Sequence, residues 1–179
     1  MIPETSLEQT EHGQRPAGEG WFVLNARDAR WLVNELGAYC GFEGEHRFEQ
    51  LGINLNVLEP GVPMCMYHWE NDQEDFLVLA GEALLIVEGQ ERPLKQWDFV
   101  HCPRRARHVI VGAGSGTCLV LAVGSREADE QDWGGYPVDE VALGHEAGVE
   151  RETSDAKEAY AGYSRPAPTE YRDGWLPDY

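Results

Sequence analysis

The chain has 179 residues, of which 42% are hydrophobic and 26% are charged, values that are typical of one globular domain. Its 14 Lys and Arg residues stand against 32 Asp and Glu residues, which gives a formal net charge of −18. This negative field repels phosphate backbones and anionic lipids, so we expect neither nucleic acid nor a membrane surface as a partner.

Targeting signals and cysteine usage point to the cytoplasm. Residues 1–20 contain no apolar core of a secretory signal, and no apolar run approaches the roughly 20 residues of a membrane-spanning helix. The four cysteines are widely spaced and form no CxxC pair. We therefore expect reduced thiols and a cytoplasmic protein.

Residues 1–123 are predicted to form a polar arm followed by strands. Residues 1–20 lack an apolar period and predict a flexible N-terminal arm. Structure is expected to begin at 21–24, with another apolar piece at 31–33. Short strand-like runs separated by turn residues follow at 48–58, 64–70, 76–80, 83–87, 99–102, 108–111 and 117–123. No long helical period interrupts them, which predicts an all-β sandwich or barrel.

The composition changes after Gly124. Residues 125–135 are acidic and contain glycine, as expected of a linker, and 137–145 predict a short helix with proline in its first turn. Asp155 with Glu158 predicts the start of a second short helix that runs to Tyr160. We therefore expect residues 125–179 to form a C-terminal extension that packs on the barrel or on a partner subunit.

Polar residues in the middle of the chain suggest a metal site. If 64–70 is a strand, Met64, Met66, His68 and Glu70 share one face, and the two methionines indicate that this face is interior. Glu74 begins the next predicted strand. Buried carboxylates require a counter-charge, and a divalent cation would supply it.

Two stretches carry a family resemblance. Residues 61–81 resemble the first cupin motif, with His68, Glu70 at the position of the second histidine, Glu74 and Gly81. Residues 98–108 resemble the second motif through Asp98, Pro103 and His108.

The resemblance implies a single jelly-roll (cupin) β-barrel over residues 21–124. It also implies one divalent ion, Zn, Mn, Fe or Ni, held by His68, Glu70, Glu74 and His108. Glu70 departs from the usual histidine, and the alternative is that it accepts a hydrogen bond from a metal-bound water.

Three arginines precede His108, and Arg105 stands where the second motif usually has glycine. Arg104, Arg105 and Arg107 could bind a carboxylate or phosphate of a substrate beside the metal. The alternatives are a solvated turn, or ion pairs with Glu70 and Glu74. His101 also lies on a predicted strand, where we expect a buried neutral histidine bonded to backbone in preference to a ligand.

An apolar outer face and the resemblance together indicate a homodimer. Tyr67, Trp69, Leu77 and Leu79 fall opposite the interior face, so a tail or a second subunit should cover them. Homodimers are usual in the family.

Two functions remain open. One is a metal-dependent enzyme that acts on a small sugar, sugar phosphate or carboxylate, as an isomerase with Glu70 moving a proton or as an oxygenase. The other is a non-catalytic cupin that binds a metal or small ligand.

Overall fold

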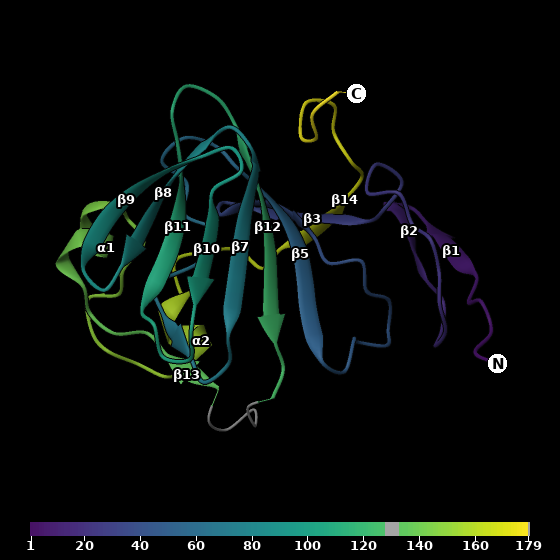
Figure 1. Ribbon diagram of the computed structural model, residues 1–179, viewed down its shortest axis with the longest axis horizontal. Coiled ribbons are helices and arrows are strands. Elements are labelled where there is room, and N and C mark those ends of the chain that lie inside the picture. Colours follow the sequence, from purple (N-terminus) through teal and green to yellow (C-terminus); the bar gives the residue numbers. More distant parts are fainter. Residues whose placement is uncertain (128–132, 179) are drawn as a thin grey trace.

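A computed structural model describes residues 1–127 and 133–178 and shows an all-β jelly roll with two short helices (Figure 1). The strands are β1 (Leu7–Thr10), β2 (Gly13–Pro16), β3 (Trp31–Asn34), β4 (Gly37–Cys40), β5 (Leu51–Leu58), β6 (Trp69–Glu70), β7 (Glu74–Ala80), β8 (Glu82–Val87), β9 (Gln90–Lys95), β10 (Phe99–Cys102), β11 (His108–Ala113), β12 (Cys118–Ser125), β13 (Gly134–Gly135) and β14 (Ala167–Thr169). The helices are α1 (Glu140–Gly144) and α2 (Ala156–Ala159). In these described ranges, neither helix has the length and apolarity needed to cross a membrane.

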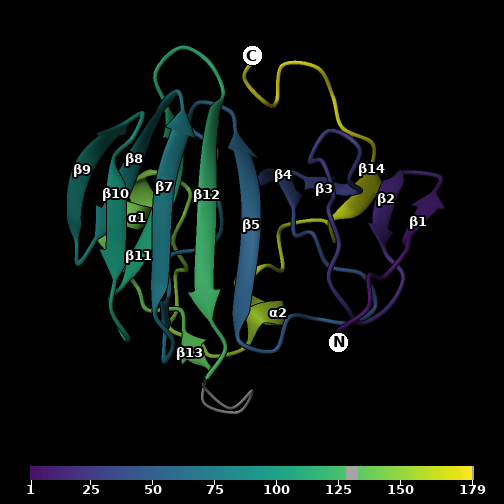
Figure 2. The same ribbon diagram turned by 45° about the vertical axis from the view of Figure 1, so that its right-hand side comes forward.

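Two sheets face each other and enclose the main core (Figure 2). The larger sheet has the strand order β10-β7-β12-β5-β4-β3-β14, and the smaller sheet has the order β11-β8-β9. Phe76 from β7, Ile110 from β11 and Val120 from β12 point into the space between them and are at most 2% exposed. Burying a large apolar side chain contributes roughly 1.5–3 kcal/mol, so this alternation decides which face of each strand is interior.

Five of the predicted strands are confirmed within one or two residues at each end, as β7, β8, β10, β11 and β12. The edge strand β9 has no counterpart in the sequence prediction. Its residues are mostly exposed and include Pro93, so the alternating apolar pattern is absent. Edge strands tolerate both features, because one side of their backbone faces solvent.

The predicted strand over 64–70 is mostly irregular, and only β6 at its end is a strand. Pro63 pairs with Val111, and His68 pairs with His108, in isolated backbone bridges. Between these two bridges, the segment from Pro63 to His68 therefore has two more residues than the part of β11 opposite it. Extra residues on one side of a strand pair bulge outward and break the alternation of side chains.

This bulge separates residues that were predicted to share a face. Met64 packs against the core between the sheets, whereas Met66 packs in a separate cluster with Tyr136. Tyr67 is 1% exposed and packs in a third cluster with Ala142 and Ala147 of the C-terminal extension. The extension of the same chain thus covers part of the predicted apolar outer face, and the homodimer stays a prediction.

Residues 7–16, inside the predicted flexible arm, form the β1–β2 hairpin. The amide of Gln14 donates to the carbonyl of Asp28 at 2.7 Å, and the amide of Arg30 donates to the carbonyl of Gln14 at 3.0 Å. Gly13, with a φ of +110°, lies so close to Ala29 that a Cβ would meet the Ala29 carbonyl oxygen at 2.6 Å. Backbone contacts hold this hairpin, and such contacts leave no apolar signature in the sequence.

The C-terminal extension returns along the jelly roll. β13 pairs with β6, and β14 pairs with β3. Helix α1 lies within the predicted 137–145 helix and is capped by Asp139, while α2 is capped by Asp155 as predicted. Part of the predicted 125–135 linker, residues 128–132, lies outside the described residues.

Candidate metal centre

Two buried histidines face the interior from neighbouring backbone segments. The amide of His68 donates to the carbonyl of His108 at 3.1 Å, and the amide of His108 donates to the carbonyl of His68 at 2.8 Å. Directly opposed residues project their side chains to the same side of a strand pair. Both rings consequently enter the interior, with centroids 5.0 Å apart.

Backbone carbonyls orient both rings. Nδ1 of His68 lies 2.9 Å from the carbonyl oxygen of Met66, and Nδ1 of His108 lies 3.0 Å from that of Ala106. A carbonyl oxygen only accepts hydrogen bonds, so we assign the proton of each neutral ring to Nδ1. Each Nε2 then presents a lone pair to the interior, the arrangement found in metal-binding histidines.

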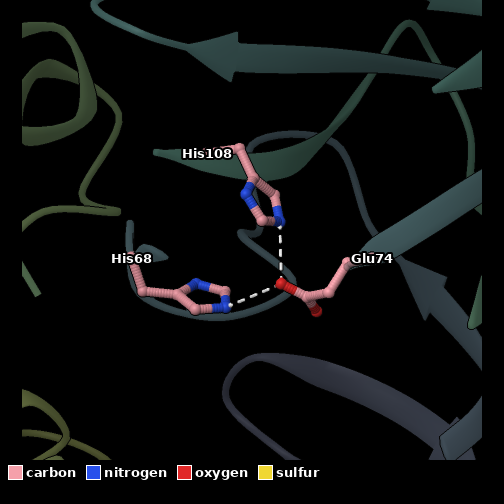
Figure 3. A group of neighbouring side chains, drawn as sticks. All are labelled: His68, Glu74 and His108. Carbon is pink, nitrogen blue, oxygen red and sulfur yellow. Dashed lines mark ion pairs between the residues drawn. The ribbon is translucent and has the colours of Figure 1, made fainter. Parts of the chain in front are cut away.

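Glu74, the first residue of β7, completes the cluster (Figure 3). Its Oε2 lies 3.4 Å from Nε2 of His68 and 3.3 Å from Nε2 of His108, and the ligand atoms of the three residues all lie within 4.8 Å of one another. Glu70 lies at the edge of this cluster, with Oε1 3.5 Å from Nε2 of His68. Of the four predicted ligands, the structure brings three together and leaves the fourth beside one of them.

The cluster attracts positive charge. Oε2 of Glu74 and Nε2 of His108 are buried acceptors without a hydrogen-bond donor in the described structure. Burial alone would lower the pKa of His108, but contacts with Cys102 and Glu74 outweigh burial and raise the pKa to about 10. Burial alone would raise the pKa of Glu74, but the two histidines outweigh it and lower the pKa to about 2. A proton or a metal ion between these atoms would relieve the clash of lone pairs.

The donor set fits a divalent metal ion. Two imidazole nitrogens and one carboxylate bind zinc in catalytic sites and ferrous iron in oxygenases, in both cases with coordination positions left for water or substrate. His68, Glu74 and His108 would supply these three ligands.

A cavity of about 280 Å³ opens at the cluster, and its wall includes His68, Glu70 and Glu74. Asn54 and Asn56 of β5 also line it, together with five aromatic residues, Tyr39, Phe76, Trp133, Tyr136 and Tyr160. The sequence prediction missed the asparagines because it followed Ile53, Leu55 and Val57 on the opposite face of this strand. Polar residues that alternate with apolar ones in a strand are the signal that could have identified them.

The predicted substrate-binding arginines lie elsewhere. Arg104 forms an ion pair with Glu127, and the backbone of Arg107 bonds to Glu88. Nε of Arg105 donates to Oδ1 of Asn71 at 2.8 Å. Among the described residues that line the cavity at the histidines there is no arginine. Their role in substrate binding therefore stays a prediction.

Arg105 stands at the position where the second motif usually has glycine, and its backbone has the conformation that favours glycine. Its φ is +70°, a conformation that glycine adopts without strain and other residues adopt rarely. The Asn71 contact and a backbone hydrogen bond to the Glu70 carbonyl at 2.7 Å hold it there.

The expectation for His101 was wrong. Its side chain is 52% exposed, and Nδ1 lies 2.7 Å from Oδ1 of Asp75. The strand β10 lies at the edge of the larger sheet, and His101 is on its exposed face rather than the core face, which holds Val100 and Cys102.

Comparison with known proteins agrees with this architecture. The family model for the Cupin domain matches residues 54–124, the region that supplies all three clustered residues. Residues 54–124 thus form a cupin domain. No curated protein matches its sequence.

Solved structures share the cupin fold. A predicted oxalate decarboxylase from Thermotoga maritima aligns over 58% of this chain and 98% of its own, with 17% identity and a TM-score of 0.52. A Cupin 2 conserved barrel domain protein from Salinispora arenicola aligns over 62% and 92%, with 19% identity and a TM-score of 0.50. A sugar phosphate isomerase of the cupin superfamily from Silicibacter pomeroyi aligns over 56% and 62%, with 25% identity and a TM-score of 0.46. This cupin thus spans less than two thirds of that isomerase.

Proposed function

We propose that this cupin binds one divalent metal ion through His68, Glu74 and His108 and uses it to hold a small, oxygen-rich ligand. The convergence of two Nε2 atoms on one buried carboxylate oxygen, with no donor between them, is the observation that carries this proposal. Three protein ligands leave coordination positions open, and the neighbouring cavity provides the space for a ligand.

The cavity wall favours a ligand with hydroxyl or carbonyl groups. Asn54 and Asn56 offer both donors and acceptors, and Tyr136 lies close enough to His68 for ring contact, with centroids 6.1 Å apart. Small ligands are generally held by a few well-placed polar groups within a mostly apolar wall. A sugar or a hydroxy acid has this chemistry.

We further propose an isomerase-type proton transfer with Glu70 as the base. Its carboxylate lines the cavity and is 29% exposed, so a ligand can reach it. The bound metal ion would polarise a carbonyl of the ligand. Glu70 would then take the proton from the hydroxyl-bearing carbon next to that carbonyl and return it to the former carbonyl carbon, while the hydroxyl proton passes to the former carbonyl oxygen. The backbone of Glu70 stays fixed between β13 and Arg105.

An oxygenase is the second candidate. Two histidines and one carboxylate are also the ligand set of non-haem ferrous oxygenases. This candidate needs no proton transfer by Glu70, which distinguishes it from the first.

Elemental analysis of the purified protein tests the metal site. We expect one metal ion per chain in the wild type, loss of metal in His108→Ala, and retention in His101→Ala, a matched histidine change at an exposed position. Full metal content in His108→Ala would contradict the proposed ligands.

Activity assays separate the functions. With metal-loaded protein and a panel of aldoses, ketoses and hydroxy acids, the isomerase proposal predicts that Glu70→Gln keeps its metal and loses turnover by about 100-fold or more. Oxygen consumption that survives in Glu70→Gln would favour the oxygenase. Binding without turnover would favour the non-catalytic alternative.

A further inference from the structure

A second, larger cavity of about 560 Å³ adjoins the cavity at the metal centre. The two share Tyr39, Asn56, Met64 and Tyr160 in their walls. One ligand could therefore extend from the first into the second. Much of the second cavity's wall comes from the C-terminal extension, which lies outside the matched Cupin domain.

The charged residues in the wall of the second cavity are basic, whereas the protein as a whole is strongly acidic. Lys157 and Arg165 both line it, while its described lining residues include no Asp or Glu. The chain as a whole has 32 acidic and 14 basic residues. Two cations in the wall of a cavity offer charge-assisted hydrogen bonds to an anion.

Local structure places Lys157 at the cavity. The side chain of Asp155 caps α2 by accepting a hydrogen bond from the Lys157 amide at 2.8 Å. Ala159 on the same helix is 7% exposed and packs with Met66 and Tyr136. With Ala159 turned inward, the helix presents Ala156 and Lys157 to the cavity.

Local structure also fixes the backbone on both sides of Arg165. The carbonyl of Ser164 accepts a hydrogen bond from Asn34 at 3.0 Å. Glu35 accepts from the amide and the hydroxyl of Ser164 at 3.0 and 2.7 Å, which holds the Ser164 backbone. After Arg165, β14 pairs with β3. The backbone on both sides of Arg165 is thus held, and its exposed guanidinium has five donors for an anion.

We propose that the second cavity is a subsite for an anionic group, phosphate or carboxylate, at the far end of the ligand, and that Lys157 and Arg165 bind this group. The remainder of the ligand would reach the metal centre past Tyr39 and Tyr160, so this proposal rests on the proposed function for the ligand's other end. It makes the C-terminal extension the element that selects charged ligands over neutral ones.

Calorimetric titration of the zinc- or manganese-loaded protein tests the subsite. The probes are matched pairs: dihydroxyacetone with dihydroxyacetone phosphate for the phosphate, and glucose with glucuronate for the carboxylate. The variant is the double change Lys157→Gln and Arg165→Gln. The control is the double change Arg92→Gln and Lys95→Gln on exposed β9, which removes the same charge far from both cavities in the sheet order.

We expect the wild type and the control to bind at least one anionic probe about tenfold more tightly than its neutral partner. The cavity variant should lose this preference and keep its metal content. Equal affinity for both members of each pair in the wild type, or an unchanged preference in the cavity variant, would overturn the subsite.

Inorganic phosphate separates this proposal from the metal proposal. Titration into metal-free protein, followed by NMR, should shift signals of residues around Lys157 and Arg165 in the wild type and not in the cavity variant. If the protein binds no metal but phosphate binds in this way, the proposed function fails and the subsite stands. If metal binds and phosphate shifts nothing at the cavity, the subsite fails alone.

Discussion

The change Tyr67→Ala should weaken the packing of the C-terminal extension against the jelly roll. The side chain is 1% exposed and packs with Ala142 and Ala147, and its amide donates to the Ala147 carbonyl at 2.6 Å. An aromatic side chain buries roughly 200 Å², which at about 25 cal/mol per Å² corresponds to about 5 kcal/mol. Buried aromatic residues changed to alanine lose about 3–5 kcal/mol of unfolding free energy. We expect about 4 kcal/mol for Tyr67→Ala.

Urea denaturation followed by circular dichroism measures this loss, and Tyr67→Phe is the control because it keeps the ring. Removal of the hydroxyl alone should change the unfolding free energy by less than about 1 kcal/mol. Because Tyr67 precedes His68, the alanine variant should also bind metal more weakly than the control. A loss below about 1 kcal/mol in Tyr67→Ala would refute the view that this ring joins the extension to the sheet.

Three further outcomes are expected. Removal of metal by a chelator should lower the unfolding free energy by about 2.7 kcal/mol when the free metal had been about 100-fold above its Kd, and calorimetry that finds no change would speak against a metal bound to the native state. The pKa of Glu43 is lowered, because hydrogen bonds from Arg126 and Phe48 outweigh the opposing effect of burial. Glu43→Gln should therefore lower the free energy of unfolding by about 1 kcal/mol near neutral pH, and this difference from the wild type should shrink as the pH falls below 4.5. A difference that stays constant across that range would contradict the ion pair. Gly81→Ala should destabilise the protein by about 1–3 kcal/mol in thermal unfolding, because Gly81 has a φ of +75° and a Cβ would meet a carbonyl oxygen at 2.5 Å. Gly116 has open space around it, so the control Gly116→Ala should leave the stability nearly unchanged.

Sequence reasoning succeeded where the local pattern and the tertiary structure agree. It predicted the strands β7, β8, β10, β11 and β12 and the three residues that cluster. His68, Glu74 and His108 lie close together in the structure, at positions identified from motif spacing and from the cost of burying a carboxylate. The side-chain parity predicted for 64–70 failed, because the two-residue bulge depends on the strand opposite and is invisible in the segment itself.

The walls of both cavities were largely beyond sequence reasoning. The amide of Met66 donates to the hydroxyl of Tyr160, which lies 94 residues further along the chain. Lys157 lies in a short helix and Arg165 in an irregular segment, and their local sequences resemble those of any solvated surface. Only the return of the extension along β3 and β6 brings them to the second cavity. Contacts of this kind depend on topology, which no local periodicity encodes.

The reciprocal backbone bridge between His68 and His108 has a consequence for folding. A strand displaced by one residue turns every side chain to the opposite face. Such a slip of β11 would carry His108 out of the interior and put Val109 in its place, and the metal would lose a ligand. A metal ion that binds only the aligned pair would therefore favour one alignment over its neighbours, and would link the metal content of the protein to the correct pairing of β11 with the segment that carries His68.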